Sequence, residues 1–229
     1  YKSFVFIFIL HDSIAGGGGL ISLPSYLMIG LPVHFAYGTN KFTSSTGTLF
    51  SAVRFAGSGK IHFKSATVSA LCALLGSYLG AEAALALDDR YLQYCLIVML
   101  PLITILVATR KNFGESSIFT LSEARVIVLS LISGLVVGAY DGFFGPGTGM
   151  FWILIYTSFF GFDMTTASGN AKIVNLASNI AALAAFILGG KVVFQIALPA
   201  AAFGILGNWI GSGLAVKKGA RVIKPAVLC

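Results

Sequence analysis

Residues 30–63 read GLPVHFAYGTNKFTSSTGTLFSAVRFAGSGKIHF, and residues 161–194 read GFDMTTASGNAKIVNLASNIAALAAFILGGKVVF. The second stretch repeats the first at a spacing of 131 residues, and matches continue beyond both. The matched positions are Gly30, Ala36, Gly38, Lys41, Phe55, Gly59, Lys60, Phe63, Leu75, Gly76 and Gly80 with Gly161, Ala167, Gly169, Lys172, Phe186, Gly190, Lys191, Phe194, Leu206, Gly207 and Gly211. The sequence therefore indicates a duplicated unit with one lysine, Lys41 or Lys172, inside an apolar stretch of each copy.

The composition indicates an integral membrane protein. Hydrophobic residues make up 57% of the 229 residues, charged residues 10%, and the mean hydropathy is +0.90. In soluble domains about 45–50% of the residues are hydrophobic and about 25% are charged. Apolar runs of about 20 residues recur, which is the length of a helix that crosses a hydrocarbon core. Because the runs are continuous rather than alternating, we expect an all-α polytopic protein of about eight transmembrane helices.

The apolar runs also predict the helices and the repeats. The expected helices cover residues 1–15, 17–30, 39–57, 62–87, 91–109, 123–144, 146–160, 165–188 and 192–216, with another beginning near 220. The two transmembrane repeats are residues 1–109 and 123–229, joined by a polar linker at 110–122. The chain starts without Met and stops inside an apolar run, so we expect a short segment beyond each end.

Two glycine-rich breaks, at residues 16–19 and 145–149, decide how the repeats are oriented. If the two arms of each break fold back to one side, ten Lys and Arg residues share one face and three lie on the other. If each broken element crosses once, the split is eight against five. The positive-inside rule prefers the first arrangement, which makes the repeats inverted. We expect this protein in the cytoplasmic membrane of a bacterium.

Each break is a candidate anion site. Glycine lets a helix stop and restart, and the restarting half-helix directs free N–H groups and its positive dipole end toward the break. Two such ends that face each other would bind an anion between the repeats. The alternative is a pair of tight helix contacts that need small residues. The predicted backbone donors are Gly17, Gly18, Gly19, Gly147, Thr148 and Gly149.

An acidic residue stands four positions before each break, Asp12 before Gly16 and Asp141 before Gly145. A carboxylate inside an apolar run is costly and typically belongs to a proton or ion relay. We therefore predict proton coupling at Asp141 and at Asp12, although Ser13 beside Asp12 is itself a candidate cap. The alternative is that each Asp caps a helix or pairs with a lysine.

A polar stripe accompanies each lysine. One stripe is Lys41, Ser44 and Thr48 at positions i, i+3 and i+7, which share one helix face. The equivalent stripe is Lys172, Asn175 and Asn179, and Asn40 and Asn170 lie just before the lysines. The lysines supply charge, and the hydroxyls and amides supply hydrogen bonds that orient a ligand. The alternative is that both lysines extend to a membrane interface, because each lies near its predicted helix start.

Motifs of other function classes are missing from the sequence. It contains no P-loop, HExxH or GxSxG pattern, so we expect neither an enzyme nor a cofactor. The three cysteines and three histidines show no metal-ligand spacing, and we expect no metal. The net charge of +7 is explained by cytoplasmic loops rather than by nucleic-acid binding.

Three stretches carry a family resemblance: AGGGGLISLP, the run GLPVHFAYGTNKFTSSTGTLFSAVRF followed by SGKI, and GAYDGFFGPGTGMF. They resemble the TauE/SafE family of sulfite exporter-like permeases, and the resemblance covers nearly the whole chain. It implies about eight helices in two related halves. It also implies transport of sulfur-containing or organic anions such as sulfite, sulfoacetate, thiosulfate, other sulfonates or carboxylates.

The sequence thus predicts a secondary transporter of a small oxyanion that works by alternating access and is coupled to a proton or another ion. Its partners would be the anion, the coupling ion and the lipid bilayer. An anion channel with the same lysines is the alternative, and a membrane-embedded enzyme or a non-transporting scaffold is a weaker one. The sequence leaves open the identity of the anion, the direction of transport and whether the protein is a homo-oligomer.

Overall fold

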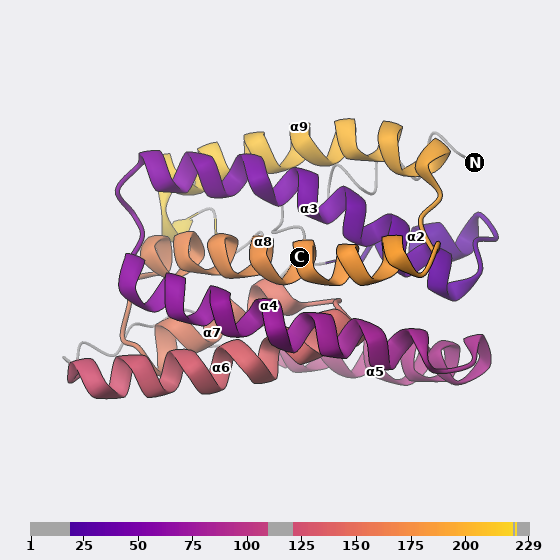
Figure 1. The fold of residues 1–229 in the computed structure, drawn as a ribbon. Coiled ribbons are helices and arrows are strands. Elements are labelled where there is room, and N and C mark those ends of the chain that lie inside the picture. The colour runs from indigo at the N-terminus through magenta and orange to yellow at the C-terminus, as the bar shows by residue number, and fades with distance from the viewer. Residues whose placement is uncertain (1–18, 110–120, 222, 224–229) are drawn as a thin grey trace.

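The fold is given by a computed structural model that describes residues 19–109, 121–221 and 223, and all regular elements in these ranges are α-helices (Figure 1). The predictions for a helix at 1–15 and for most of the linker fall outside the described residues. Of the helix expected to begin near 220, the structure describes residues 220, 221 and 223, and these are helical. The helices are α2 (Ser22–Met28), α3 (Val33–Gly57), α4 (Phe63–Leu85), α5 (Asp89–Thr109), α6 (Glu123–Phe143), α7 (Thr148–Ser158), α8 (Met164–Leu188) and α9 (Phe194–Lys218).

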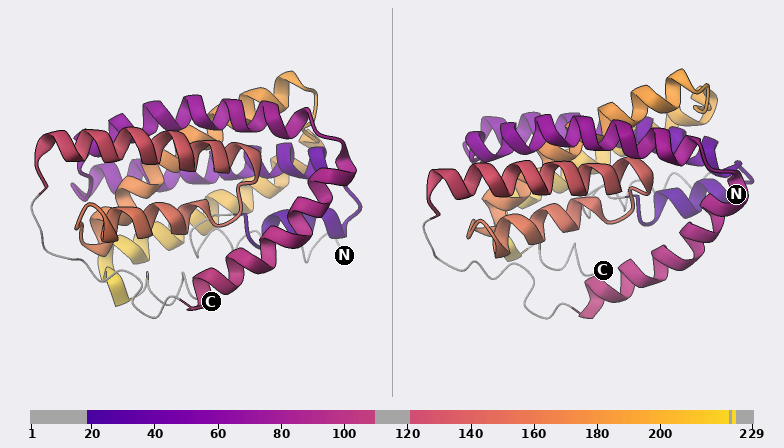
Figure 2. Two further views of the ribbon diagram at one scale, coloured as in Figure 1. Left: turned by 90° about the horizontal axis from the view of Figure 1, so that it is seen from below. Right: turned by 60° about the horizontal axis from the view of Figure 1, so that its bottom comes forward.

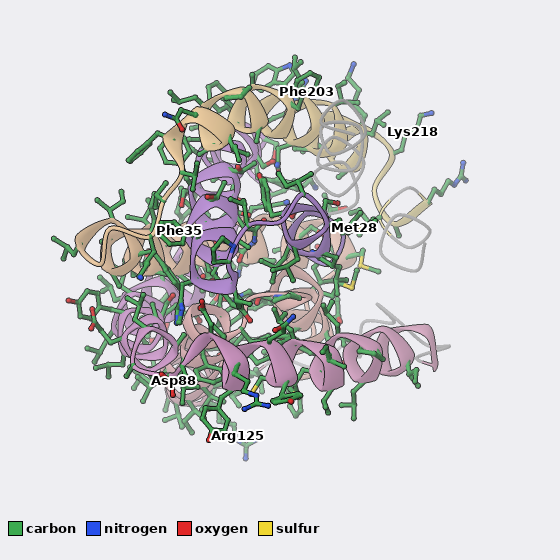
Figure 3. All side chains as sticks on the ribbon, turned by 90° about the vertical axis from the view of Figure 1, so that its right-hand side faces the viewer. Met28, Phe35, Asp88, Arg125, Phe203 and Lys218 are labelled. Atoms are coloured by element: carbon green, nitrogen blue, oxygen red, sulfur yellow. The ribbon has the colours of Figure 1, made fainter. Side chains whose placement is uncertain are left out.

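The expectation of an all-α polytopic membrane protein is confirmed. Among the described helices, α4, α6, α8 and α9 are long and apolar enough to cross a bilayer. Helix α3 also has 25 residues, but its polar stripe lowers its hydropathy. Large apolar side chains such as Leu71, Val136 and Leu198 are exposed on the outside of these helices, where lipid would cover them. Figure 3 looks along the bundle and shows α9 and α5 at its opposite margins.

Helix α3 begins earlier than the sequence indicated, at Val33 instead of residue 39. Pro32 precedes it with φ −55°, a value that suits a residue at a helix start. Gly38, which was expected to precede the helix, lies inside it at a point where the chain after α8 passes close to the α3 backbone. A Cβ on Gly38 would lie 2.2 Å from the carbonyl oxygen of Lys191. Lys41 is therefore two turns inside α3, away from the helix end.

Helices α3 and α8 run in opposite directions and make matching contacts at their two ends (Figure 1). The Val193 N–H donates to Thr39 Oγ1 at 3.2 Å, and the His62 N–H donates to Asn170 Oδ1 at 2.9 Å. Thr39 and Asn170 are 131 positions apart, as are His62 and Val193. The segment that follows α8 is thus bound to the start of α3, and the segment that follows α3 is bound to the start of α8. The residues that make these two contacts occupy equivalent positions in the two repeat stretches.

The break between α6 and α7 reverses the chain direction. Gly145 and Gly147 have φ values of +88° and +81°, which favour glycine, and the Tyr140 hydroxyl donates to the carbonyl of Pro146 at 2.5 Å. Helix α7 then runs back beside α8 and ends near the end of the bundle at which α6 begins. Figure 2 shows this hairpin, together with the tilt of α5 away from the other long helices.

Helices α4 and α6 pack backbone to backbone. A Cβ on Gly76 or Gly80 would lie 2.3 or 2.1 Å from a carbonyl oxygen of α6, and a Cβ on Gly142 would lie 1.9 Å from the carbonyl oxygen of Ser77. Helix association in lipid depends on such close approach. This contact fixes the last turn of α6, which carries Asp141, against α4.

Asp163 caps the start of α8 and provides a stability test. Its carboxylate accepts hydrogen bonds from the N–H of Thr165 at 2.9 Å and of Thr166 at 3.2 Å, and from the Thr166 hydroxyl at 2.6 Å. Partial burial raises the pKa of Asp163, but these hydrogen bonds lower it further, so the pKa lies below its usual value. We expect Asp163→Ala to reduce the free energy of unfolding by about 1 kcal/mol at neutral pH.

The depressed pKa also fixes the pH dependence of this cap. The stabilisation is complete above the pKa of an unfolded aspartate and is lost as the pH falls through the folded value. Thermal unfolding of the wild type and Asp163→Ala in detergent should therefore converge in acid. Glu82→Ala, an exposed change on α4, is the control. A gap between Asp163→Ala and wild type that stays constant into acid would contradict the capping role.

Candidate functional site

A buried ion pair lies at the centre of the site. The Nζ atom of Lys41 is 2.9 Å from Oδ2 of Asp141, and both side chains are only 2% exposed. Lys41 comes from α3 and Asp141 from the last turn of α6. The head group of Lys41 is thus held by a carboxylate inside the protein and does not extend to a membrane interface. Charges are buried in proteins when they are paired in this way.

Helix α8 supplies further polar groups to this pair. Lys41 Nζ donates to Asn179 Oδ1 at 3.1 Å, and the Ser178 hydroxyl donates to Asp141 Oδ2 at 2.6 Å. A Cβ on Gly145 would lie 3.4 Å from Lys41 Nζ, so the backbone of the α6–α7 break passes beside the ammonium group. Residues from α3, α6, α8 and the break therefore converge on one charge.

The half-helix α7 starts directly after this break. Thr148 Oγ1 donates to the carbonyl of Gly145 at 2.5 Å, and the N–H of Met150 donates to the carbonyl of Gly147 at 3.0 Å. These bonds close the turn that leads into α7. The positive dipole end of α7 lies within one turn of Gly145, so it adds to the positive potential near Lys41. Gly147, Thr148 and Gly149 are thus placed at the start of this half-helix.

Two polar groups of the predicted stripes have no hydrogen-bond partner within the described part of the chain. They are Thr48 Oγ1 on α3 and Asn175 Oδ1 on α8, and both residues are fully buried. Thr48 shares the helix face of Lys41, and Asn175 shares that of Asn179. Buried polar atoms in proteins are nearly always bonded. Ser44 of the same stripe is half-buried.

Lys172 has a different partner from Lys41. It is half-buried, and its Nζ atom is 3.3 Å from Asn208 Oδ1 on α9. The same oxygen accepts the Ser51 hydroxyl at 2.9 Å, and Asn208 Nδ2 donates to the carbonyl of Gly204 at 3.0 Å. The two lysines thus occupy equivalent sequence positions but differ in their contacts. Lys41 forms an ion pair with a carboxylate, and Lys172 donates a hydrogen bond to an amide oxygen.

The remaining predicted residues hold the fold around these groups or lie elsewhere. Asn40 Oδ1 accepts the Ser22 hydroxyl at 2.7 Å, and its amide nitrogen lies against Gly19. Asn170 binds the α3–α4 turn through the His62 N–H, and its amide donates to Ser65 Oγ at 2.9 Å. Both asparagines join helix ends. The predictions for Asp12, Gly17 and Gly18 lie outside the described residues.

Comparison with known proteins identifies the family. The family model described as sulfite exporter TauE/SafE matches residues 3–229. The chain belongs to the sulfite exporter TauE/SafE family. The resemblance seen in the sequence motifs is thereby confirmed over nearly the whole chain.

Relatives of this TauE/SafE protein are known from several bacteria. A probable membrane transporter protein, ORF9, from a Sinorhizobium species is 33% identical over 95% of this chain and 82% of its own length. A probable membrane transporter protein from Haemophilus influenzae is 32% identical over 95% of this chain and 84% of its own length. The probable membrane transporter protein YfcA of Escherichia coli K12 is 32% identical over 95% of this chain and 80% of its own length. No solved structure gives a significant match.

Two site residues of this TauE/SafE protein were not predicted from its sequence, Ser178 and Asn208. Each is a polar residue in an apolar helix, and a polar side chain in such a place needs a partner. That rule would have selected both, although Ser and Asn are common enough that neither stands out. No cluster of His, Cys, Asp or Glu that could hold a metal ion occurs among the residues that the structure describes.

Proposed function

We propose that this protein is a secondary transporter that moves a small organic or sulfur-containing oxyanion, such as sulfite, thiosulfate or a sulfonate, across the bacterial cytoplasmic membrane. The observation that carries the proposal is the fully buried ammonium group of Lys41, held between membrane helices beside a glycine break. The family name refers to sulfite export, and relatives are named as probable membrane transporters.

The chemistry around Lys41 suits an oxyanion. An oxyanion has several acceptor oxygens, and the site offers an ammonium group, the positive end of α7 and the hydroxyl of Thr48. The amides of Asn175 and Asn179 would orient the ligand. Lys172 and Asn208 would form the equivalent contact of the second repeat.

The antiparallel course of α3 and α8 supports a pair of inverted repeats. Equivalent residues of the two repeat stretches make reciprocal contacts, Thr39 with Val193 and Asn170 with His62. In an inverted pair the two halves exchange roles when one rocks against the other, so a central site opens to each side in turn. The basic residues at the α3–α4 turn and at the end of α9 would then mark the cytoplasmic side.

A thermal-shift screen tests this function. The purified protein would be heated with sulfite, thiosulfate, sulfate, sulfoacetate, taurine and short carboxylates. A true substrate present at 100 times its Kd should stabilise the folded state by about 2.7 kcal/mol. We expect this shift to disappear in the double variant Lys41→Gln/Asp141→Asn, which keeps a neutral hydrogen-bonded pair, and to weaken in Lys172→Gln.

Lys218→Gln is the matched control, because Lys218 is exposed at the end of α9 and points away from the bundle (Figure 3). Its anion-induced thermal shift should equal that of the wild type. If the anion-induced thermal shift persists both in the double variant and in Lys172→Gln, the proposal that these lysines bind the anion is wrong. Uptake into proteoliposomes then separates a transporter from a channel, because only a transporter should give saturable flux that a pH gradient drives.

A further inference from the structure

We propose that Asp141 occupies the anion position on Lys41 when substrate is absent, and that an anion replaces it only as Asp141 takes up a proton. This inference rests on the proposed function and specifies how the same site couples anion and proton.

The first step is charge balance. In the structure the ammonium group of Lys41 is already neutralised by the Asp141 carboxylate at 2.9 Å, and both groups are buried. An added anion would leave a net negative charge inside the membrane, with Lys41 shared between two anions. Burying an uncompensated charge costs several kcal/mol. Protonation of Asp141 lowers the net negative charge by one, which removes this cost for a monovalent anion and reduces it for a divalent one, because the anion then becomes the single counter-ion of Lys41.

The second step is hydrogen bonding of the protonated acid. Ser178 Oγ donates to Asp141 Oδ2 at 2.6 Å, and the same hydroxyl lies 3.1 Å from the carbonyl oxygen of Asn175. When Asp141 carries a proton, its O–H can donate to Ser178 Oγ while the Ser178 hydroxyl turns to the Asn175 carbonyl. Both groups stay bonded, so Ser178 acts as a positioning residue that supports either protonation state of Asp141.

The third step is to ask which other groups could take the role of Asp141. The other titratable groups of α6 are Glu123, Arg125 and Tyr140, and Tyr37 of α3 lies near Tyr140. The helices packed against α6 carry Lys64, Cys72, Tyr78 and Glu82 on α4, Tyr156 on α7 and Lys172 on α8. The Tyr140 hydroxyl is bound to the carbonyl of Pro146, and the side chains of Lys64 and Glu82 are exposed. Asp141 is the carboxylate paired with Lys41, so it is the group that an anion must displace.

The exchange links anion binding to protons quantitatively. Where Asp141 is ionised in the free protein, binding should take up about one proton per anion, and the Kd should rise about tenfold per pH unit. The anion and the proton would move in the same direction, so a pH gradient would drive accumulation of the anion on its alkaline side.

Calorimetry on the purified wild type tests the linkage. Thiosulfate, sulfoacetate and acetate are titrated between pH 5 and 8 in pairs of buffers that differ in ionisation enthalpy, which yields the number of protons taken up. We expect wild-type affinity to fall with rising pH, and Asp141→Asn to bind as tightly as the acidic wild type at every pH, without proton uptake. In proteoliposomes Asp141→Asn should carry anion down its gradient but lose the accumulation that a pH gradient drives.

Glu82→Gln is the matched control, since it removes an exposed carboxylate of α4 and should behave as the wild type. Anion binding with the same pH dependence in the wild type and in Asp141→Asn would overturn the exchange while leaving the transporter proposal intact. Failure of every anion to bind to either protein at any pH would overturn the proposed function itself.

Discussion

Replacement of Lys41 by Met should destabilise the protein by about 3–5 kcal/mol, because it leaves a buried carboxylate without its cation. The double variant Lys41→Met/Asp141→Leu should recover most of this loss, since a buried ion pair exchanged for apolar residues of similar size is often neutral or stabilising. Unfolding in detergent, followed by tryptophan fluorescence, measures both variants. Trp152 is fully buried in a core with α8 and is a suitable reporter.

The loss caused by Lys41→Met should shrink in acid, because a protonated Asp141 needs no counter-ion. Lys218→Met provides the control, and as an exposed change it should stay within about 0.5 kcal/mol of the wild type. A double variant that is as unstable as Lys41→Met would show that the single change acts through lost packing. The ion pair would then contribute little to the free energy of folding, and folding stability would not explain why these two charges are buried together.

Most of the fold was predictable because a membrane restricts the chain to helices of a given length. The expected helix at 165–188 differs by one residue from α8, and that at 123–144 by one from α6. The start of α3 was misplaced because Pro32 and Gly38 resemble a loop in sequence. Gly38 is required inside the helix by the passing carbonyl of Lys191. Such a tertiary requirement leaves no local signal.

The sequence singled out the two charged residues of the candidate site but did not determine that they pair with each other. Lys41 and Asp141 each stand out as charged residues in apolar runs, yet they lie 100 positions apart and are not related by the repeat. The alternative that the acid pairs with a lysine was open from the sequence, and the structure shows this contact. Asn170 looked like a ligand-binding residue, but its amide is bound to the α3–α4 turn. Only the relative placement of helices distinguishes these roles.

The second large effect is expected at the α4–α6 contact, where Gly142→Ala should destabilise the protein by about 3 kcal/mol, the upper end of overpacking costs. The new Cβ would lie 1.9 Å from the carbonyl oxygen of Ser77, so a backbone and not a flexible side chain must move. Gly57→Ala is the matched control, because nothing lies within 4 Å of a Cβ there. It should stay within about 0.5 kcal/mol of the wild type in the same unfolding assay.

Gly142→Ala should also weaken the site, since the displaced residue connects α4 to the ion pair. The Ser77 hydroxyl donates to the carbonyl of Ser178 at 2.6 Å, and Ser178 in turn donates to Asp141, the direct neighbour of Gly142. A shift of Ser77 therefore moves both the carboxylate and its hydrogen-bond donor relative to Lys41. We expect the anion-induced thermal shift to fall in Gly142→Ala and to be unchanged in Gly57→Ala. A Gly142→Ala protein that is destabilised but keeps the full shift would show that α4–α6 packing supports the fold alone, and that Asp141 is positioned by α8.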